Sequence, residues 1–367
     1  MIEKELQNTD EAQSAGEQLS IVDISKAGYQ LLKENKIEEA IDKFAKILTI
    51  DENNNFALVG MGDAMRKKGL VQKAIDYYQK CLKHHSENNY ALFGLADCLR
   101  STNQLPQAIT IWEKYLLQDK QNVTVLTRIA DAYRKVRNFS KSNQTYQKVL
   151  LIDSNNPYAI IGLGHLYYDF KDYKEALVYW ERMIKDGFKN VDIRVLTSIG
   201  NCHRKLKSFS DGVKYFEAAL ELDADNFYAL FGLADCHRAL KNIEESLKYW
   251  EIILEQDPKN KMILTRTGDA YRNLNELDKA KEFYERALDI DFDTYATIGL
   301  ALIAKQKGNY EESIDSFKSL IQQDQVNYRL YAELADCYVK IGDKTKAAEI
   351  MEKLQNIKKL NLKTGEV

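Results

Sequence analysis

The chain has 367 residues, of which 45% are apolar and 29% are charged, the ordinary composition of a folded soluble protein. Lys and Arg number 52 against 55 Asp and Glu, a balance that argues against nucleic-acid binding, which needs a clustered basic excess. No stretch approaches about 18 apolar residues, so we expect no membrane-spanning helix. Five cysteines without disulfide spacing fit a reducing compartment, and we expect a cytoplasmic location.

The N-terminal segment is polar and acidic. It begins MIEKELQNTDEAQSAGEQ, which contains no apolar core, so we do not expect a signal peptide. A segment of this composition cannot bury enough apolar surface to fold. We predict that residues 1–20 are a disordered polar tail.

Internal repetition dominates the rest of the chain. The string YALFGLADC occurs at Tyr90–Cys98 and again, 138 residues later, at Tyr228–Cys236. A ladder of small residues recurs about every 34 residues, at Gly28, Gly62, Ala96, Ala130, Gly164, Gly200, Ala234, Gly268, Ala301 and Ala335. A ladder of large residues recurs with the same period, at Phe44, Tyr78, Trp112, Tyr146, Trp180, Phe216, Trp250, Tyr284, Phe317 and Met351. Together they predict ten units over residues 21–361, one of them lengthened by two residues near KDGFKN (185–190).

Each unit has the pattern of two helices separated by a break. In Asn89–Asp119, the string STNQLP interrupts two stripes of apolar residues that have helical spacing. The first stripe is Leu92, Leu95, Ala96 and Leu99, and the second is Ala108, Ile109, Trp112, Tyr115 and Leu116. Pro106 suits the first turn of the second helix. We expect the small residues to let paired helices approach closely while the aromatic residue fills the space opposite.

This period, these ladders and strings such as FALVGMGDAMRKKGLVQKAIDYYQKCL resemble the tetratricopeptide repeat (TPR) family. The resemblance covers about residues 21–361, with a possible break or kink near 185–190 and a C-terminal tail over 362–367. It implies an all-α, right-handed superhelical solenoid of about ten helical hairpins. It also implies a concave groove, lined by the first helix of each hairpin, that binds protein segments. The chain departs from the family pattern in lacking the first-helix Trp and in having the unit-ending proline only at Pro258.

A longer period is superposed on the first. Tryptophan occurs only in alternate units, and the intervening units share strings such as VLTRIADAYRK and ILTRTGDAYRN. The doubled period of about 68 residues indicates that pairs of repeats were duplicated. This duplication explains why YALFGLADC recurs.

A charged stripe follows the first helices, and by resemblance to the family it faces the groove. An acid ladder contains Asp63, Asp97, Asp131, Asn201, Asp235, Asp269 and Asp336. Three residues later stands a basic ladder of Arg66, Arg100, Arg134, Arg204, Arg238 and Arg272. Asp and Arg at this spacing can pair within one helix or with a neighbouring helix. The stripe is either an ion-pair ladder that stiffens the solenoid or a row of donors and acceptors for an extended ligand.

Five first helices begin with an aromatic residue that is followed four positions later by glycine. The pairs are Phe56 and Gly60, Tyr90 and Gly94, Tyr158 and Gly162, Tyr228 and Gly232, and Tyr295 and Gly299. Intervening units have polar side chains at the glycine position, including Arg128 and Arg266. The rings either pack on neighbouring helices or wall a chain of pockets, each open above a glycine. In the second case Gly94→Leu and Gly232→Leu abolish binding and leave stability nearly unchanged.

Two units depart from the ladders. The fifth has His165 and Asp169 in its first helix, and the ninth has Leu302 and Lys305 within YATIGLALIAKQKG, without an aspartate. The apolar ninth unit indicates either closer core packing or a surface for a partner or for self-association.

No catalytic or metal-binding motif is found. Cys98, Cys202, Cys236 and Cys337 share one position at which other units have alanine, so we expect small core residues. No C-x-x-C or H-x-x-x-H spacing, phosphate-binding loop or nucleophile elbow accompanies them. We expect no metal, no cofactor and no enzymatic activity.

The predicted function is therefore a scaffold that binds a protein or peptide segment in the groove. Two alternatives stay open at this point. One is an accessory subunit that docks through its convex face or its ends, and the other is a solenoid that binds a small molecule. The sequence does not determine the oligomeric state.

Overall fold

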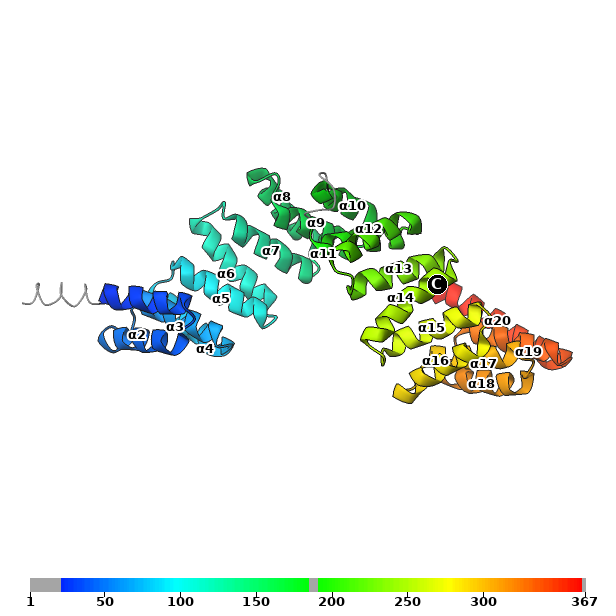
Figure 1. Ribbon diagram of the computed structural model, residues 1–367. Helices are drawn as coiled ribbons and strands as arrows, with labels where there is room; N and C mark the ends of the chain where they lie inside the picture. Colours follow the sequence, from blue (N-terminus) through cyan, green and yellow to red (C-terminus); the bar gives the residue numbers. More distant parts are fainter. Residues whose placement is uncertain (1–20, 185–190, 365–367) are drawn as a thin grey trace, which may run out of the picture. The chain divides into compact units, whose positions relative to one another are not determined.

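The structure, a computed structural model, describes residues 21–184 and 191–364, with side chains described as far as residue 357 (Figure 1). The chain divides into two compact units, Met1–Lys185 (unit 1) and Asp186–Val367 (unit 2). The expected N-terminal tail and the KDGFKN segment lie outside the described residues. Residues 362–364, expected to begin a C-terminal tail, continue the last helix.

The described part of unit 1 consists of five helical hairpins, each a first helix followed by a second helix (Figure 1). The first hairpin pairs a helix over residues 21–33 with α2 (Ile37–Ile50). The others are α3 (Asn55–Lys67) with α4 (Val71–His84), α5 (Asn89–Ser101) with α6 (Leu105–Gln118), α7 (Val123–Lys135) with α8 (Phe139–Ile152), and α9 (Pro157–Asp169) with α10 (Tyr173–Glu181). A short 3₁₀ helix, Arg182–Ile184, follows.

The described part of unit 2 also consists of five hairpins. They are α11 (Ile193–Lys205) with α12 (Phe209–Leu222), α13 (Phe227–Ala239) with α14 (Ile243–Gln256), α15 (Lys261–Asn273) with α16 (Leu277–Ile290), α17 (Thr294–Gln306) with α18 (Tyr310–Gln323), and α19 (Tyr328–Lys340) with α20 (Lys344–Thr364). The predicted all-α solenoid of hairpins is confirmed, and Pro106 lies in the first turn of α6 as expected.

The start of nearly every first helix is set by a capping side chain. An oxygen of an asparagine or aspartate accepts a hydrogen bond from a backbone N–H of the first turn, which satisfies a donor that the helix itself leaves unpaired. The capping residues are Asn54, Asn88, Asn122, Asn156, Asp192, Asn226, Asn260 and Asp293. This ladder keeps the period of the repeat and fixes where each first helix begins.

The turn inside each hairpin uses one residue in the left-handed conformation. Glycine occupies this position at Gly69, Gly308 and Gly342, but the other turns use a residue with a side chain, for example Asn103 and Lys241. In the Lys241 turn, the next amide, that of Asn242, donates to the carbonyl of His237 at 2.9 Å and closes the end of α13. The backbone therefore places the Lys241 side chain directly after a first helix.

The core of both units follows the predicted ladders. The large residues of the second helices are buried from Phe44 to Phe317, whereas Met351 is 45% exposed in the last second helix, α20. The small residues four positions earlier are buried too. Where that residue is serine, its hydroxyl donates to a carbonyl of the first helix: Ser142 to Ala130 at 2.8 Å, Ser246 to Ala234 at 2.7 Å, and Ser313 to Ala301 at 2.9 Å.

From the second hairpin of unit 1 onward, junctions between hairpins within each unit alternate between a narrow and a wide type. At narrow junctions, a Tyr or Phe ring of a second helix lies between two first helices that also contact each other directly, as Tyr78 does between α3 and α5. At the wide junction of unit 2, the larger indole of Trp250 contacts Phe231 of α13 and Arg266 of α15. Trp112 has the equivalent place in unit 1. This alternation gives the doubled period its physical basis.

Candidate functional site

Exposed aromatic residues follow the caps of five first helices, α3, α5, α9, α13 and α17. Tyr90 of α5 is 78% exposed, and its counterpart in α13, Tyr228, is 69% exposed. Phe56, Tyr158 and Tyr295 are exposed at the same position, two residues after the cap. The interpretation in which these rings pack on neighbouring helices is therefore wrong. A row of exposed rings is an unusual apolar surface for a folded protein.

The expected gaps above the glycines are absent, so the hypothesis of open pockets is corrected. A Cβ atom added to Gly94 would lie 2.4 Å from the ring of the buried Tyr78, and one added to Gly232 would lie 2.3 Å from Phe216. Gly162 has the same relation to Tyr146. These glycines admit a core ring from the preceding second helix, so they contact the core and not a ligand.

Arginine replaces glycine at this position where the preceding second helix carries Trp112 or Trp250. Arg128 lies over the ring of Phe93 at 5.0 Å and bonds Asp97 at 2.7 Å. Arg266 lies over Phe231 at 5.5 Å from its centroid. The guanidinium thus fills the wider junction and gains cation–π stabilisation there.

The acid and basic ladders form ion pairs both within and between first helices. In unit 1, Arg66 pairs with Asp63 at 3.1 Å on its own helix, and Arg134 pairs with Asp131 at 2.8 Å. Arg134 also pairs with Asp169 of the next first helix. The predicted pairing between neighbouring helices is therefore confirmed.

In unit 2 the arginines outnumber their carboxylates. Three guanidiniums surround Asp235: Arg204 at 2.6 Å, Arg238 at 2.7 Å and Arg266 at 3.6 Å. On α15, Arg272 lies 3.8 Å from Asp269, whose carboxylate also accepts a hydrogen bond of 2.7 Å from the Tyr284 hydroxyl. This face of unit 2 consequently carries excess positive charge.

Two ladder carboxylates have a lowered pKa. Burial acts to raise the pKa of Asp235, but hydrogen bonds and charge from Arg238 and Arg204 outweigh it. Burial likewise opposes ionisation of Asp131, and Arg134 followed by Lys135 brings its pKa below the usual value. Both carboxylates are therefore fixed as anions at neutral pH, and their arginines are held in place.

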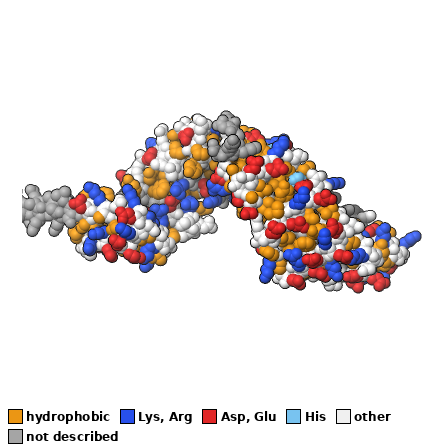
Figure 2. Space-filling model, viewed as in Figure 1, with side chains coloured by type: hydrophobic (Ala, Val, Ile, Leu, Met, Phe, Trp, Pro, Cys, Tyr) orange, Lys and Arg blue, Asp and Glu red, His pale blue; other side chains and the backbone are white. Residues whose placement is uncertain are grey.

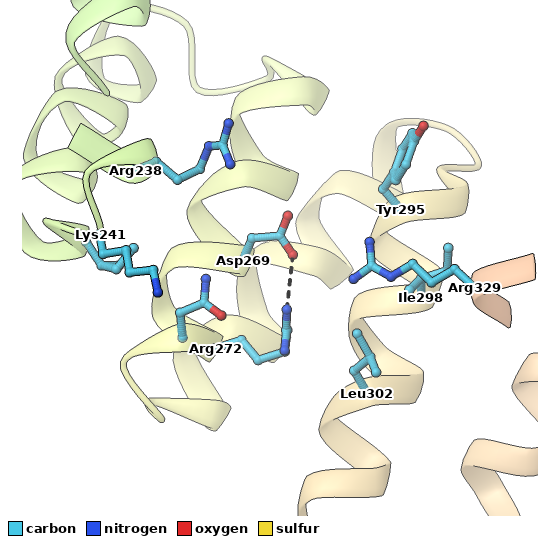
Figure 3. Close-up of a pocket in the computed structure, with 10 residues that line it drawn as sticks. Arg238, Lys241, Asp269, Arg272, Tyr295, Ile298, Leu302 and Arg329 are labelled. Atoms are coloured by element: carbon cyan, nitrogen blue, oxygen red, sulfur yellow. Dashed lines mark ion pairs between the residues drawn. The ribbon is translucent and has the colours of Figure 1, made fainter. Parts of the chain in front are cut away.

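A cavity of about 500 Å³ opens on the first helices of unit 2 (Figure 3). Its basic lining residues come from four elements: Arg238 of α13, Lys241 of the following turn, Arg272 of α15 and Arg329 of α19. Figure 3 shows Arg329 extending toward the side of α15 that carries Asp269 and Arg272. Asp269 is the acidic residue among the lining side chains, and the apolar ones are Tyr295, Ile298, Leu302 and Ile243.

Repeat-family models match four segments of the chain. Models described as tetratricopeptide repeat match residues 65–130, 199–250, 263–294 and 304–360, together more than half of the chain. The chain belongs to the tetratricopeptide repeat family. TPR arrays in general serve as protein-interaction scaffolds.

One solved structure supports the TPR fold, and two others are reported with it. The C-terminal part of a TPR repeat-containing protein from Cytophaga hutchinsonii is 18% identical, with 66% of this chain and 99% of that chain covered and a TM-score of 0.57. Pseudomonas aeruginosa PilF is 16% identical over 58% of this chain and 96% of its own, with a TM-score of 0.49. The MamA protein is 24% identical over 46% of this chain and 90% of its own, with a TM-score of 0.42. No curated protein sequence matches the chain.

The cysteines of this TPR chain are buried, as predicted. Burial raises the pKa of the Cys236 thiol to about 11 and that of Cys202 to about 12, so neither is a reactive thiolate at neutral pH. Within residues 21–184 and 191–364, no cluster of three or more His, Cys, Asp or Glu is placed to hold a metal ion. In the same part of the chain, no helix has the length and apolarity needed to cross a membrane.

The structure brings Arg238, Asp269 and Arg272, three of the predicted groove residues, to one cavity of the TPR array. Lys241 and Arg329 complete its charge, and sequence reasoning missed both. Lys241 follows the basic ladder by three residues in a turn, and Arg329 stands one residue into its helix, so neither belongs to a ladder. Aligning equivalent positions of the two units reveals Lys241, because its counterpart is the neutral Asn103.

Proposed function

We propose that this chain is a non-catalytic TPR scaffold that holds an extended segment of a partner protein along the faces of its first helices. The observation that supports this proposal is the row of exposed aromatic rings, with Phe56, Tyr90 and Tyr158 in unit 1 and Tyr228 and Tyr295 in unit 2. Rings anchored on rigid helices offer a large contact area at low entropic cost, and aromatic residues are enriched where proteins bind each other.

The charged ladders support the same function by giving the surface fixed polarity. Figure 2 shows side chains of both charges and apolar side chains interspersed on the visible face of each unit. Because the arginines are held by hydrogen bonds to aspartates, as Arg134 is to Asp131, they lose little freedom when a ligand binds. The ladders therefore stiffen the first-helix face and also present donors to a partner segment.

Site-specific photo-crosslinking tests this proposal. The photoreactive amino acid p-benzoylphenylalanine replaces Tyr90 or Tyr228 on the first helices, and in matched controls it replaces Leu117 or Leu151 on the second helices. These leucines are 75% and 87% exposed, so all four positions tolerate the replacement. Each variant is irradiated in lysate of the source organism, and crosslinked proteins are identified by mass spectrometry.

We expect one partner to crosslink from the tyrosine positions and not from the leucine positions. Capture from Leu117 and Leu151 alone would overturn the proposal and favour docking through the second helices. That alternative rests on the same exposed leucines, which contact solvent at the ends of α6 and α8. A partner captured equally at all four positions would also contradict a specific first-helix site.

A further inference from the structure

The cavity of unit 2 combines an excess of cations with an apolar floor. Ile298 and Leu302 are each only 8% exposed and form the apolar part of its lining, while the Tyr295 ring is open to solvent. Arg238, Lys241, Arg272 and Arg329 provide four positive charges against the one carboxylate of Asp269. A volume of about 500 Å³ accommodates two or three amino-acid side chains and lies in the usual range for ligand pockets.

Few of these cations are neutralised by the protein. Arg272 lies 3.8 Å from Asp269, which is longer than a hydrogen bond, and Asp269 is already bonded to Tyr284. Arg238 shares Asp235 with two other arginines. The ion pair drawn among the labelled lining residues in Figure 3 is that of Arg272 with Asp269. Lys241 and Arg329 thus direct their charges to solvent and the cavity.

Unit 1 provides the same backbone with its cations more fully paired. The counterpart of Arg272 is Arg134, which is held by both Asp131 and Asp169. In unit 2 the position of Asp169 is occupied by Gln306, which carries no charge. The counterparts of Lys241 and Leu302 are Asn103 and His165, so unit 1 lacks this lysine and part of the apolar floor. The lining residue Asn273 corresponds to the cation Lys135, which pairs with Asp131 at 3.2 Å.

We propose that the unit 2 cavity recognises an acidic segment of a partner protein, with two or more Asp or Glu side chains flanking an apolar one. The carboxylates bind Lys241, Arg272 and Arg329, and the apolar side chain rests on Ile298 and Leu302. This inference rests on the proposed function and names the chemistry of the partner. A nucleic acid fits less well, because a run of phosphates has no apolar group that would rest on Ile298 and Leu302.

Fluorescence anisotropy with three labelled, end-blocked peptides provides the test. The acidic probe is EDELEDE, its neutral counterpart is QNQLQNQ, and EDESEDE lacks the apolar residue. We expect EDELEDE to bind the full chain at least about tenfold more tightly than QNQLQNQ, because opposite charges and the desolvated anchor both contribute. EDESEDE should bind about fivefold more weakly than EDELEDE. Binding should weaken as salt rises from about 50 to 300 mM.

The decisive variant is Gln306→Asp, which gives Arg272 the second carboxylate that Arg134 has in unit 1. Because residue 306 lies at the exposed end of α17, we expect unchanged folding and about tenfold weaker binding of EDELEDE. Arg329→Glu should weaken binding at least as much. Lys259→Glu makes the same charge change in the exposed loop before α15, outside the cavity lining, and should change Kd less than about twofold.

Several results would overturn the inference. They are equal binding of EDELEDE and QNQLQNQ, an unchanged Kd in Gln306→Asp, and equal weakening by Lys259→Glu. If a twelve-nucleotide RNA bound more tightly than EDELEDE, the ligand of the cavity would be a nucleic acid and not an acidic protein segment. Competition by about 10 mM inorganic phosphate, with no advantage of EDELEDE over EDESEDE, would reduce the cavity to a general anion site. If Gln306→Asp leaves the Kd of EDELEDE unchanged while crosslinking at Tyr228 persists, the cavity proposal is wrong and the proposed scaffold function still stands.

Discussion

The two copies of YALFGLADC lie in α5 and α13, where the same nine residues have different charged surroundings. Asp97 in unit 1 has two arginines near it, Arg128 at 2.7 Å and Arg100 at 3.7 Å. Asp235 in unit 2 has three: Arg204 at 2.6 Å, Arg238 at 2.7 Å and Arg266 at 3.6 Å. The additional arginine reaches Asp235 from the preceding first helix, α11.

A pair of replacements in that preceding hairpin explains the additional contact. In unit 1, Arg66 bonds Asp63 at 3.1 Å, and the Tyr78 hydroxyl donates to the same carboxylate at 2.7 Å. The corresponding residues of unit 2 are Arg204, Asn201 and Phe216. Since Asn201 is neutral, Arg204 bonds its amide oxygen at 3.0 Å and still extends to Asp235. Phe216 has no hydroxyl that would need an acceptor.

The comparison shows that the repeat conserves its core and varies its charge at a few first-helix and turn positions. Asp63, Asn103 and Asp169 of unit 1 correspond to Asn201, Lys241 and Gln306 of unit 2, and each of these replacements adds one positive charge. Lys135 and Arg137 of unit 1 correspond to the neutral Asn273 and Asn275, and each of these replacements removes one. None of these positions contributes to the hydrophobic core. Duplicated hairpins can therefore differ in partner chemistry without a change of fold.

The largest expected effect concerns the packing of a first-helix glycine against a second-helix ring, which both units share. Gly94→Leu and Gly232→Leu should each lower the free energy of unfolding by about 3 kcal/mol, because the new side chain collides with the buried ring of Tyr78 or Phe216. Urea unfolding followed by circular dichroism measures the change. The sequence alone predicted the opposite, a loss of binding at constant stability.

Exposed rings provide the control for those variants. Tyr90→Ala and Tyr228→Ala remove side chains that are mostly in solvent, so each should change stability by less than about 0.5 kcal/mol. If the glycine variants proved as stable as the tyrosine variants, the close packing of glycine against the second-helix ring would be refuted.

A second prediction exploits the unequal charge around the two aspartates. Asp235→Asn should cost about 2 kcal/mol of stability and Asp97→Asn about 1 kcal/mol, because three partly buried arginines lose their common acceptor in one case and two in the other. Chemical denaturation of both variants measures the difference. Equal losses would mean that the contact from Arg204 contributes nothing.

The fold was predictable from the sequence because periodic packing leaves a strong signal. A ring such as Tyr78 and the small residues beside it recur in every unit up to that of Phe317, and burial permits few alternatives at those positions. The site was less predictable. The sequence pattern could not show that a ring from the preceding hairpin fills the space beside Gly94, since that contact joins residues of two units.

The ladders also did not show that equivalent arginines of the two units are paired differently. The ladders predicted that Asp and Arg pair within one helix or with a neighbouring helix, and the outcome depends on which helix an arginine reaches. Arg134 and Arg272 occupy the same ladder position, and their surroundings differ through one residue of the next first helix, Asp169 or Gln306. Distances between helices, rather than spacing within them, decide this difference.

A third prediction concerns pH. The pKa values of Asp131 and Asp235 are lowered in the folded chain, so each contributes stability above the unfolded value of about 3.9. That contribution is lost as the pH falls below about 4, through the folded pKa. Urea unfolding at steps between pH 6 and pH 2.5 should therefore show a decline that begins near pH 4.

The variant Asp235→Asn separates this contribution from general acid unfolding. It should make the acid decline shallower than in the wild type, since the residue at position 235 no longer titrates. A decline identical to that of the wild type would show that Asp235 titrates alike in the folded and unfolded states.

The smallest expected effect compares the two hairpin turns at Asn103 and Lys241, both in the left-handed conformation. Lysine tolerates this conformation poorly, whereas asparagine tolerates it well, and glycine accepts it at some cost in unfolded-chain entropy. Lys241→Gly should therefore raise stability by up to about 0.5 kcal/mol, and Asn103→Gly should leave it unchanged or slightly lower. Thermal unfolding detects the difference. If Lys241→Gly were the more destabilising of the two, the lysine side chain would contribute to the fold itself, and it would not be available to a ligand.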